Sequence, residues 1–302
     1  MKYNLITILG PTAVGKTFLG ASLADHFGGE IISADSRQVY RRMDIGTGKD
    51  LNDYLINGSR VPYHLIDVIE PKEEFNLFLF NQHFYKIYDE ITSRGLIPFL
   101  VGGTGLYLHS ILKSYDLNQA EFNDERFSEL NRYSMEELAE MLKTINPSLH
   151  NTTDLLIKER VVRAIMISEK TTNQGSEKRS EINSLIIGVS LEREKIKKRI
   201  TSRLIQRLES GMIEEVKKLI DEGITLERLE TFGLEYKFVA KYLTGELNRN
   251  DMFQKLNSAI HGFAKRQMTW FRKMEREGIK INWIEGPDYK AAEQIISKNY
   301  FS

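Results

Sequence analysis

The first part of the chain, residues 1–115, alternates between short apolar runs and longer segments with helical spacing. The apolar runs predict strands at 3–9, 30–34, 63–68 and 97–101. The helical spacing predicts helices at 15–27, 76–94 and 104–113. Alternating strands and helices indicate an α/β fold, in which helices flank a parallel sheet.

The pattern changes at residues 116–183, which are polar and contain helical patches at 122–131, 134–145 and 152–168. No strand signal interrupts them, so they predict a small helical insert. The strand expected at 184–189 returns the chain to the sheet. Residues 192–276 predict a series of helices separated by glycines, and 280–284 predicts a strand at an edge of the sheet. We therefore expect a core formed by 1–115 and 184–302, interrupted by the insert.

Composition narrows the class of protein without identifying it. Lys plus Arg and Asp plus Glu are each 42, so no overall field attracts a polyanion and any nucleic-acid contact must come from local patches. The chain has no cysteine, which excludes disulfides, thiolate zinc sites and thiol catalysis. The start runs straight into the first strand, and no apolar run reaches membrane-spanning length. We expect a cytoplasmic monomer.

The strongest chemical signal follows the first predicted strand. The segment Gly10-Pro11-Thr12-Ala13-Val14-Gly15-Lys16-Thr17 has the strand–GxxxxGK[ST]–helix order of a phosphate-binding loop, or P-loop. Its backbone N–H groups and the helix N-terminus attract an anion, Lys16 adds a full charge, and the Thr17 hydroxyl is suited to ligate Mg²⁺. The alternative is a chance glycine-rich turn. A kinase, an NTPase and a prenyltransferase would all use such a loop.

Two further polar signatures follow strand ends, at 33–36 and 102–105. In parallel sheets the ligand crevice lies at the carboxyl ends of the strands, so both signatures and the P-loop should face one crevice. Asp35 is well placed there as a general base. The alternatives for Asp35 are a helix N-cap or a carboxylate that assists Mg²⁺ indirectly.

Asp67 and Thr104 each allow two interpretations. Asp67 resembles the carboxylate that assists Mg²⁺ in P-loop enzymes, but an ordinary turn residue is slightly favoured. Thr104 follows Gly102 and Gly103, which allow a ligand to approach the backbone closely, and it is also a suitable helix cap.

Basic residues form three local groups. Arg199, Arg203 and Arg207 recur every four residues and so share a helix face. They predict either a solvated basic face or cations that neutralise a leaving pyrophosphate. Residues 265–273 mix bases with aromatics, which suits RNA, although an amphipathic helix with Trp270 and Phe271 in the core is the more frequent case. The third group is in the predicted insert.

These motifs together resemble the tRNA dimethylallyltransferase (tRNA isopentenyltransferase) family from residue 5 to about 276. The resemblance is carried, in order, by the P-loop, Asp35-Ser-Arg-Gln-Val-Tyr40, Met43-Asp-Ile-Gly-Thr47, His64-Leu-Ile-Asp67, Leu100-Val-Gly-Gly-Thr-Gly-Leu-Tyr107, Arg160-Val-Val-Arg163-Ala164, Arg199-Ile-Thr-Ser-Arg203 and Ala264-Lys-Arg-Gln-Met-Thr-Trp270. The sequence departs from the usual family pattern at Gly48, Arg207 and Leu234, where Ala, Met and Tyr are more frequent.

The resemblance implies a definite reaction and a role for each motif. Dimethylallyl diphosphate would give its five-carbon group to the exocyclic amine of the adenosine next to the anticodon, and pyrophosphate would leave. The P-loop, residues 10–17, would hold the diphosphate, with Mg²⁺ at Thr17. The catalytic residues implied are Thr12, Lys16, Asp35 and Arg203. Contacts with tRNA are expected from Asp35, Ser36, Arg37, Gln38, Thr104, Glu159, Arg160, Arg163, Lys265, Arg266 and Gln267. A P-loop kinase or NTPase, and prenylation of free adenine nucleotides, remain the alternatives.

Overall fold

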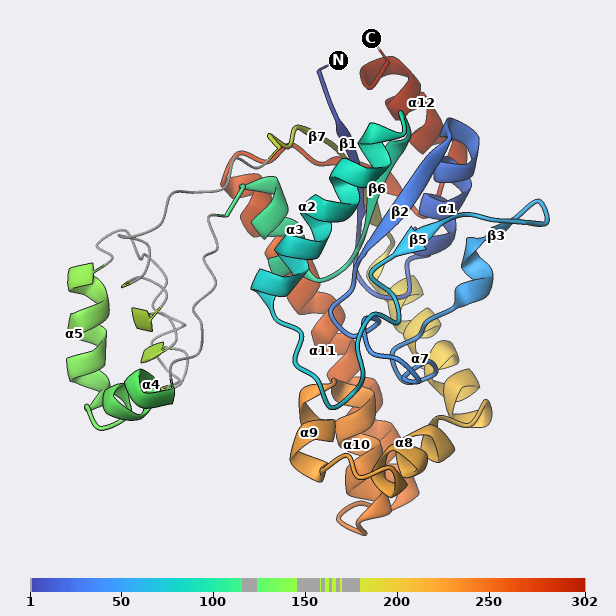
Figure 1. Ribbon diagram of the computed structural model, residues 1–302. Coiled ribbons are helices and arrows are strands. Elements are labelled where there is room, and N and C mark those ends of the chain that lie inside the picture. The colour runs from blue at the N-terminus through green and yellow to red at the C-terminus, as the bar shows by residue number, and fades with distance from the viewer. Residues whose placement is uncertain are drawn as a thin grey trace. The chain divides into compact units, whose positions relative to one another are not determined.

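A computed structural model describes residues 2–115, 124–145, 158, 161, 162, 165, 166, 169 and 180–301 (Figure 1). The chain divides into two compact units, one formed by Met1–Ser114 and Ser180–Ser302 and the other by Tyr115–Arg179. In the described part of the chain, no helix is both long enough and apolar enough to cross a lipid bilayer.

The first unit is built on one parallel sheet. Its strands are β1 (Leu5–Leu9), β2 (Gly29–Ala34), β5 (Tyr63–His64), β6 (Ile97–Gly102), β7 (Ser184–Ser190) and β8 (Asn282–Glu285). Their spatial order is β5-β2-β6-β1-β7-β8, and every neighbouring pair is parallel. This confirms the predicted α/β fold and the edge strand near residue 282. In the register, Gly102 lies opposite both Leu9 and Ala34, so the segments that follow β1, β2 and β6 leave the sheet side by side.

Helices cover both faces of this sheet (Figure 1). One face packs against α1 (Lys16–Phe27) and α12 (Tyr289–Asn299), and the other against α2 (Leu77–Ser93), α3 (Gly105–Leu112) and the C-terminal part of α11 (Arg249–Arg276). Because both faces are covered, every residue of β1 and β2 is buried. This is why the apolar residues of these strands are not confined to alternate positions, and why Thr7, Glu30 and Ser33 are buried as well.

A bundle of helices follows β7, as the spacing of 192–276 predicts. It consists of α7 (Arg193–Glu209), α8 (Met212–Asp221), α9 (Leu226–Thr231), α10 (Leu234–Leu243) and the first part of α11. Gly211 and Gly245, with φ of 99° and 81°, occupy left-handed positions between helices that favour glycine. The apolar core of the bundle also buries Val39, Tyr40 and Met43 from the segment after β2. The bundle thereby supports a wall of the crevice at the sheet edge.

One strand prediction is wrong in extent. The strand expected at 63–68 ends at His64, because Leu65 and Asp67 have φ of 63° and 55°, which no β-strand contains. The sequence analysis also missed α12, a short 3₁₀ helix (Leu51–Tyr54), and the hairpin of β3 (Leu55–Ile56) and β4 (Ser59–Arg60).

The second unit has a small apolar core of its own. Its described helices are α4 (Asp124–Leu130) and α5 (Met135–Ile145), in agreement with the helices expected at 122–131 and 134–145. Ser134 and Glu137 form a reciprocal capping box at the start of α5. The core residues are Leu130, Leu138, Leu142, Val161, Val162, Ile165 and Met166. Most of the helix predicted at 152–168 lies outside the described residues, and the insert's role stays a prediction.

Candidate active site

A pocket of about 390 Å³ lies at the carboxyl edge of the sheet. It is lined by P-loop residues, by Ser33 near the end of β2 and Asp35 just after it, by Gly102 at the end of β6, and by arginines of α7. The three strand-end signatures therefore share one crevice, as expected for a parallel sheet. Its further lining residues include Arg37, Gln38, Thr47, Gly48, Asp50, Asp53 and Tyr54.

The P-loop is shaped by its glycines. A Cβ on Gly10 would lie 2.6 Å from the carbonyl oxygen of Val189, and Gly15 has φ of 88° just before α1 begins at Lys16. The backbone N–H groups of residues 13–17 have no hydrogen-bond acceptor in the described part of the chain. The loop thus presents a run of unused donors at a helix N-terminus, which is the usual arrangement for binding a phosphate.

Lys16 lies in this loop with little electrostatic support from the protein. Its ammonium donates to the carbonyl oxygen of Pro11 at 3.3 Å. Burial lowers the pKa of Lys16 to about 8, Asp35 opposes that shift, and Arg203 and Arg37 add to it. The charge of Lys16 is therefore one that an incoming anion would stabilise.

Asp35 lies beside the P-loop in the same pocket. Its Oδ1 accepts the backbone N–H of Arg37 at 3.0 Å and lies 3.9 Å from Nε of the same residue. The carboxylate of Asp35 accepts from the backbone two residues later, which is the hydrogen bond of an Asx turn. No helix begins at Asp35, so the alternative in which Asp35 is a helix N-cap is wrong. One carboxylate oxygen is fixed by the turn, and the side chain remains 24% exposed.

Thr104 connects the ends of β2 and β6. Its hydroxyl oxygen accepts the backbone N–H of Ser36 at 3.1 Å. Thr104 occupies the N-cap position of α3, which confirms the predicted cap, although its side chain makes no capping hydrogen bond. Gln38 lies on the same side of the pocket and donates to the carbonyl oxygen of Gly48 at 3.3 Å.

All three arginines of α7 line the pocket, so this face of the helix borders the crevice, although Arg199 is exposed. Arg199 donates to the Val14 carbonyl oxygen of the P-loop at 3.4 Å. Arg203 forms an ion pair with Asp50. The third arginine, Arg207, donates to Glu235 of α10 at 3.3 Å, and the second oxygen of Glu235 accepts from Arg37 at 2.8 Å.

Helix α11 carries both the expected basic residues and a contact that sequence reasoning missed. Lys265 and Arg266 are exposed, whereas Phe271 is fully buried, as the amphipathic-helix interpretation expected. Gln267 is also buried; its Oε1 accepts the backbone N–H of Thr12 at 2.8 Å and its Nε2 donates to Gly103 at 2.8 Å. A polar residue on the apolar face of a helix signals a buried partner, and that signal was available in the sequence.

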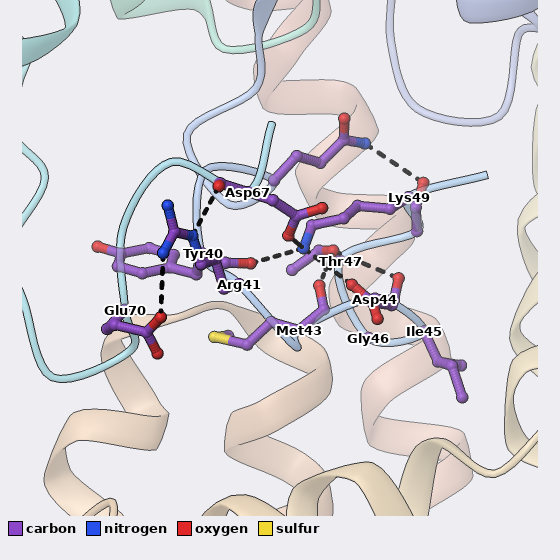
Figure 2. Close-up of polar contacts among 12 residues, drawn as sticks. Tyr40, Arg41, Met43, Asp44, Ile45, Gly46, Thr47, Lys49, Asp67 and Glu70 are labelled. Atoms are coloured by element: carbon purple, nitrogen blue, oxygen red, sulfur yellow. Dashed lines mark hydrogen bonds and ion pairs between the residues drawn. The ribbon is translucent and has the colours of Figure 1, made fainter. Parts of the chain in front are cut away.

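A second glycine-containing loop, residues 44–50, contributes Thr47, Gly48 and Asp50 to the pocket lining and was not singled out from the sequence as a structured element. Figure 2 shows Lys49 directed at the carbonyl oxygen of Tyr40 and at the carboxylates of Asp44 and Asp67. The Lys49 ammonium is fully buried. Asp67 is therefore an ion-paired turn residue outside the pocket lining, and the alternative in which it assists Mg²⁺ is wrong.

Three further residues were predicted to contact tRNA. Glu159, Arg160 and Arg163 lie outside the described residues. Within the described ranges, no group of three or more His, Cys, Asp or Glu side chains is arranged to hold a metal ion.

The chain is similar to known proteins over almost its full length. The model of a family described as IPP transferase matches residues 38–274. The chain is 54% identical to tRNA dimethylallyltransferase 1 of Geotalea uraniireducens over 301 residues, which is 99% of both chains. It is 34% identical to the solved tRNA isopentenylpyrophosphate transferase of Bacillus halodurans, with a TM-score of 0.69 over 99% of this chain and 95% of that one.

A solved eukaryotic dimethylallyltransferase acting on tRNA is 23% identical and has a TM-score of 0.80, covering 99% of this chain and 79% of its own. This likeness concerns the fold, and it extends over the whole of the present chain. The matched family model and the high identity over full length lead to one assignment. The chain belongs to the IPP transferase family, the family of the tRNA dimethylallyltransferases.

Proposed function

We propose that this chain transfers the dimethylallyl group of dimethylallyl diphosphate to the exocyclic amine of the adenosine adjacent to the anticodon in tRNA, and releases pyrophosphate. The observation that carries the proposal is that the P-loop and Asp35 line one pocket. An anion-binding loop and a carboxylate thus face the same volume, as a reaction between an allylic diphosphate and an amine requires.

The diphosphate binds at the P-loop end. The free N–H groups of residues 13–17, the Lys16 ammonium and Arg199 hold its oxygens, and Thr12 lies near the reacting end. Arg203 stabilises the charge that develops as the C–O bond breaks. Arg203 pairs with Asp50, but both side chains are substantially exposed, so exchanging this partner for a diphosphate costs little.

Mg²⁺ fits the same end of the pocket. The Thr17 hydroxyl has no hydrogen-bond partner in the described part of the chain, and oxygen ligands are those that Mg²⁺ prefers. Thr17 would hold the ion, which when bound would neutralise part of the leaving group's charge.

Asp35 acts on the acceptor. Its Oδ1 is held by the Arg37 N–H, which leaves the other oxygen to accept a proton from the adenine amine. The new N–C bond forms at the allylic carbon, the C–O bond to the diphosphate breaks with its electron pair going to oxygen, and the amine proton passes to Asp35. Adenine reaches this position only after leaving its stack, so the reaction requires base flipping.

The RNA contacts extend from the pocket to its rim. Ser36, Arg37, Gln38 and Thr104 lie beside Asp35, and the exposed Lys265 and Arg266 supply charge for phosphates. Gln267 is buried, so in this proposal it acts on RNA only through the P-loop that it holds. The insert, with Glu159, Arg160 and Arg163, contacts the anticodon arm. The protein acts as a cytoplasmic monomer.

Incubation with dimethylallyl diphosphate labelled in the prenyl group tests the proposal. Unmodified tRNA should become labelled, and removal of Mg²⁺ with EDTA should slow the labelling until Mg²⁺ is restored. AMP as acceptor tests the free-nucleotide alternative, and ATP with tRNA tests the kinase or NTPase alternative. Turnover of ATP without labelled RNA would overturn the proposal.

A further inference from the structure

Gly48 and the guanidinium of Arg207 are in close contact in the pocket wall. A Cβ on Gly48 would lie 1.8 Å from Nη2 of Arg207 and 2.6 Å from its Cζ. The guanidinium therefore packs against the backbone of the 44–50 loop at the place where another residue would project its side chain. Gly48 also has φ of 68°, so an L side chain would be strained there as well as crowded.

The guanidinium of Arg207 is held in place but not neutralised. Glu235, whose side chain is 3% exposed, divides its two oxygens between Arg207 and Arg37. Two cations thus share one buried carboxylate. Burial and the nearby Arg203 lower the pKa of Arg207, as expected for a cation with too little negative charge around it.

The position of Arg207 along α7 separates it from the diphosphate. Arg199 contacts the P-loop, Arg203 lies one turn further on, and Arg207 lies one turn beyond that. Two steps of four residues advance about 12 Å along a helix axis. Arg207 consequently lies toward Arg37, at the end of the pocket assigned to the acceptor.

We infer that Arg207 binds a phosphodiester oxygen of the acceptor RNA in this pocket. The inference rests on the proposed function, because it assumes that RNA enters there. Of the five guanidinium donors, only Nη1–H has a partner in the described part of the chain. The planar fork suits two phosphate oxygens, and an anion would offset the excess charge, whereas a neutral adenine ring would not.

The test measures binding of an anticodon stem-loop RNA by fluorescence anisotropy, without donor. Arg207→Met should weaken RNA binding roughly tenfold, within the range for a hydrogen bond to a charged group. The KM for dimethylallyl diphosphate should change much less than the RNA affinity, because Arg207 lies two helical turns beyond Arg199, which contacts the P-loop. Lys198→Met removes a charge from an exposed position on the same helix outside the pocket lining and should change binding much less.

Neutral methylphosphonate linkages beside the acceptor adenosine identify the phosphate. They should weaken binding to the wild-type protein about tenfold, and they should have no further effect on Arg207→Met. Equal sensitivity of both proteins would overturn the inference. So would an Arg207→Met variant that binds RNA normally but has a raised KM for the donor, because the anion would then be the diphosphate.

Gly48→Ala gives an independent check. Its Cβ should displace the guanidinium and weaken RNA binding as Arg207→Met does, and the two changes together should cost no more than either alone. Additive losses would show that Gly48 does not act through Arg207. Absence of prenylated RNA with the wild-type protein would instead reject the proposed function, and the binding measurements are independent of that outcome.

Discussion

Two glycine-containing loops line the pocket and use their backbone N–H groups in opposite ways. In the P-loop, the N–H groups of residues 13–17 have no acceptor in the described part of the chain. In the 44–50 loop, the carboxylate of Glu215 accepts the N–H groups of Asp44, Ile45 and Gly46 at 2.8–2.9 Å, and the hydroxyl of Tyr236 at 2.7 Å. The N–H groups of the P-loop are therefore available to an anion, whereas those of the 44–50 loop already bind the Glu215 carboxylate.

The two loops differ in their lysines as well. Lys16 of the P-loop has a lone carbonyl acceptor, whereas Lys49 is buried against two carboxylates and a carbonyl oxygen. A loop whose donors and charge are satisfied internally is fixed, and it supplies a wall. A loop whose donors and charge are unsatisfied is available for a ligand. We therefore expect changes on the open side to alter activity and changes on the closed side to alter stability.

The largest effect is expected at Asp35, on the open side. Asp35→Asn should lower kcat by at least ~10²-fold, the usual contribution of a general base, because the amide cannot take the proton of the amine. The stability should change little, since the amide oxygen still accepts the Arg37 N–H. Single-turnover prenylation and urea unfolding measure the two quantities.

Asp44→Asn is the matched control on the closed side. It makes the same chemical change in a residue that is 58% exposed and pairs with Lys49. It should leave kcat within a few-fold of the wild-type value. Turnover by Asp35→Asn at more than a tenth of the wild-type rate would remove Asp35 from its proposed role.

The next effect is expected at Lys49 and concerns stability. Lys49→Met should lower the free energy of unfolding by about 2 kcal/mol, because the Tyr40 carbonyl and two carboxylates lose their partner. The loss is smaller than for a wholly buried pair because Asp44 and Asp67 remain 58% and 37% exposed. Urea unfolding checks the value.

Below pH 8, Lys16→Met should not lower the free energy of unfolding, in contrast to Lys49→Met. The folded-state pKa of Lys16, about 8, lies below its unfolded value, so the protonated form disfavours folding when both states carry the charge. Removing the charge should leave stability unchanged or increase it, while donor binding is lost. Similar losses of stability for both lysine variants would contradict the contrast between the loops.

The contrast also explains which features could be predicted from the sequence. The P-loop, the sheet and the position of Asp35 depend on short contiguous patterns, and these gave the fold and the shared crevice. The partners of Lys49 and Gln267 could not be predicted in this way. Lys49 meets Asp67 only because the chain turns left-handed at 65 and 67, and Gln267 meets Thr12 across 255 residues. Such pairings depend on the assembled fold.

Gln267 accepts the Thr12 N–H at the start of the P-loop, and its removal is a further test of the contrast between the two loops. Gln267→Leu should free the Thr12 N–H and leave the Gly103 carbonyl without its donor, at a cost of about 1.5 kcal/mol in stability. The KM for dimethylallyl diphosphate should rise, because Thr12 is no longer held. Gln267→Glu, which still accepts the Thr12 N–H, should retain more of the donor affinity than Gln267→Leu.

The smallest expected effect is the pH dependence of donor binding. Since the pKa of Lys16 lies near 8, raising the pH from 7 to 9 discharges the free ammonium, and kcat/KM for dimethylallyl diphosphate should fall by less than tenfold. The fall is limited because the P-loop N–H groups and the arginines keep their donors throughout this range. The bound diphosphate favours the charged form, so kcat at saturating donor should show a weaker dependence. Lys16→Arg stays charged up to pH 9 and should lose the dependence; if it persists unchanged in that variant, another group on the open side carries it.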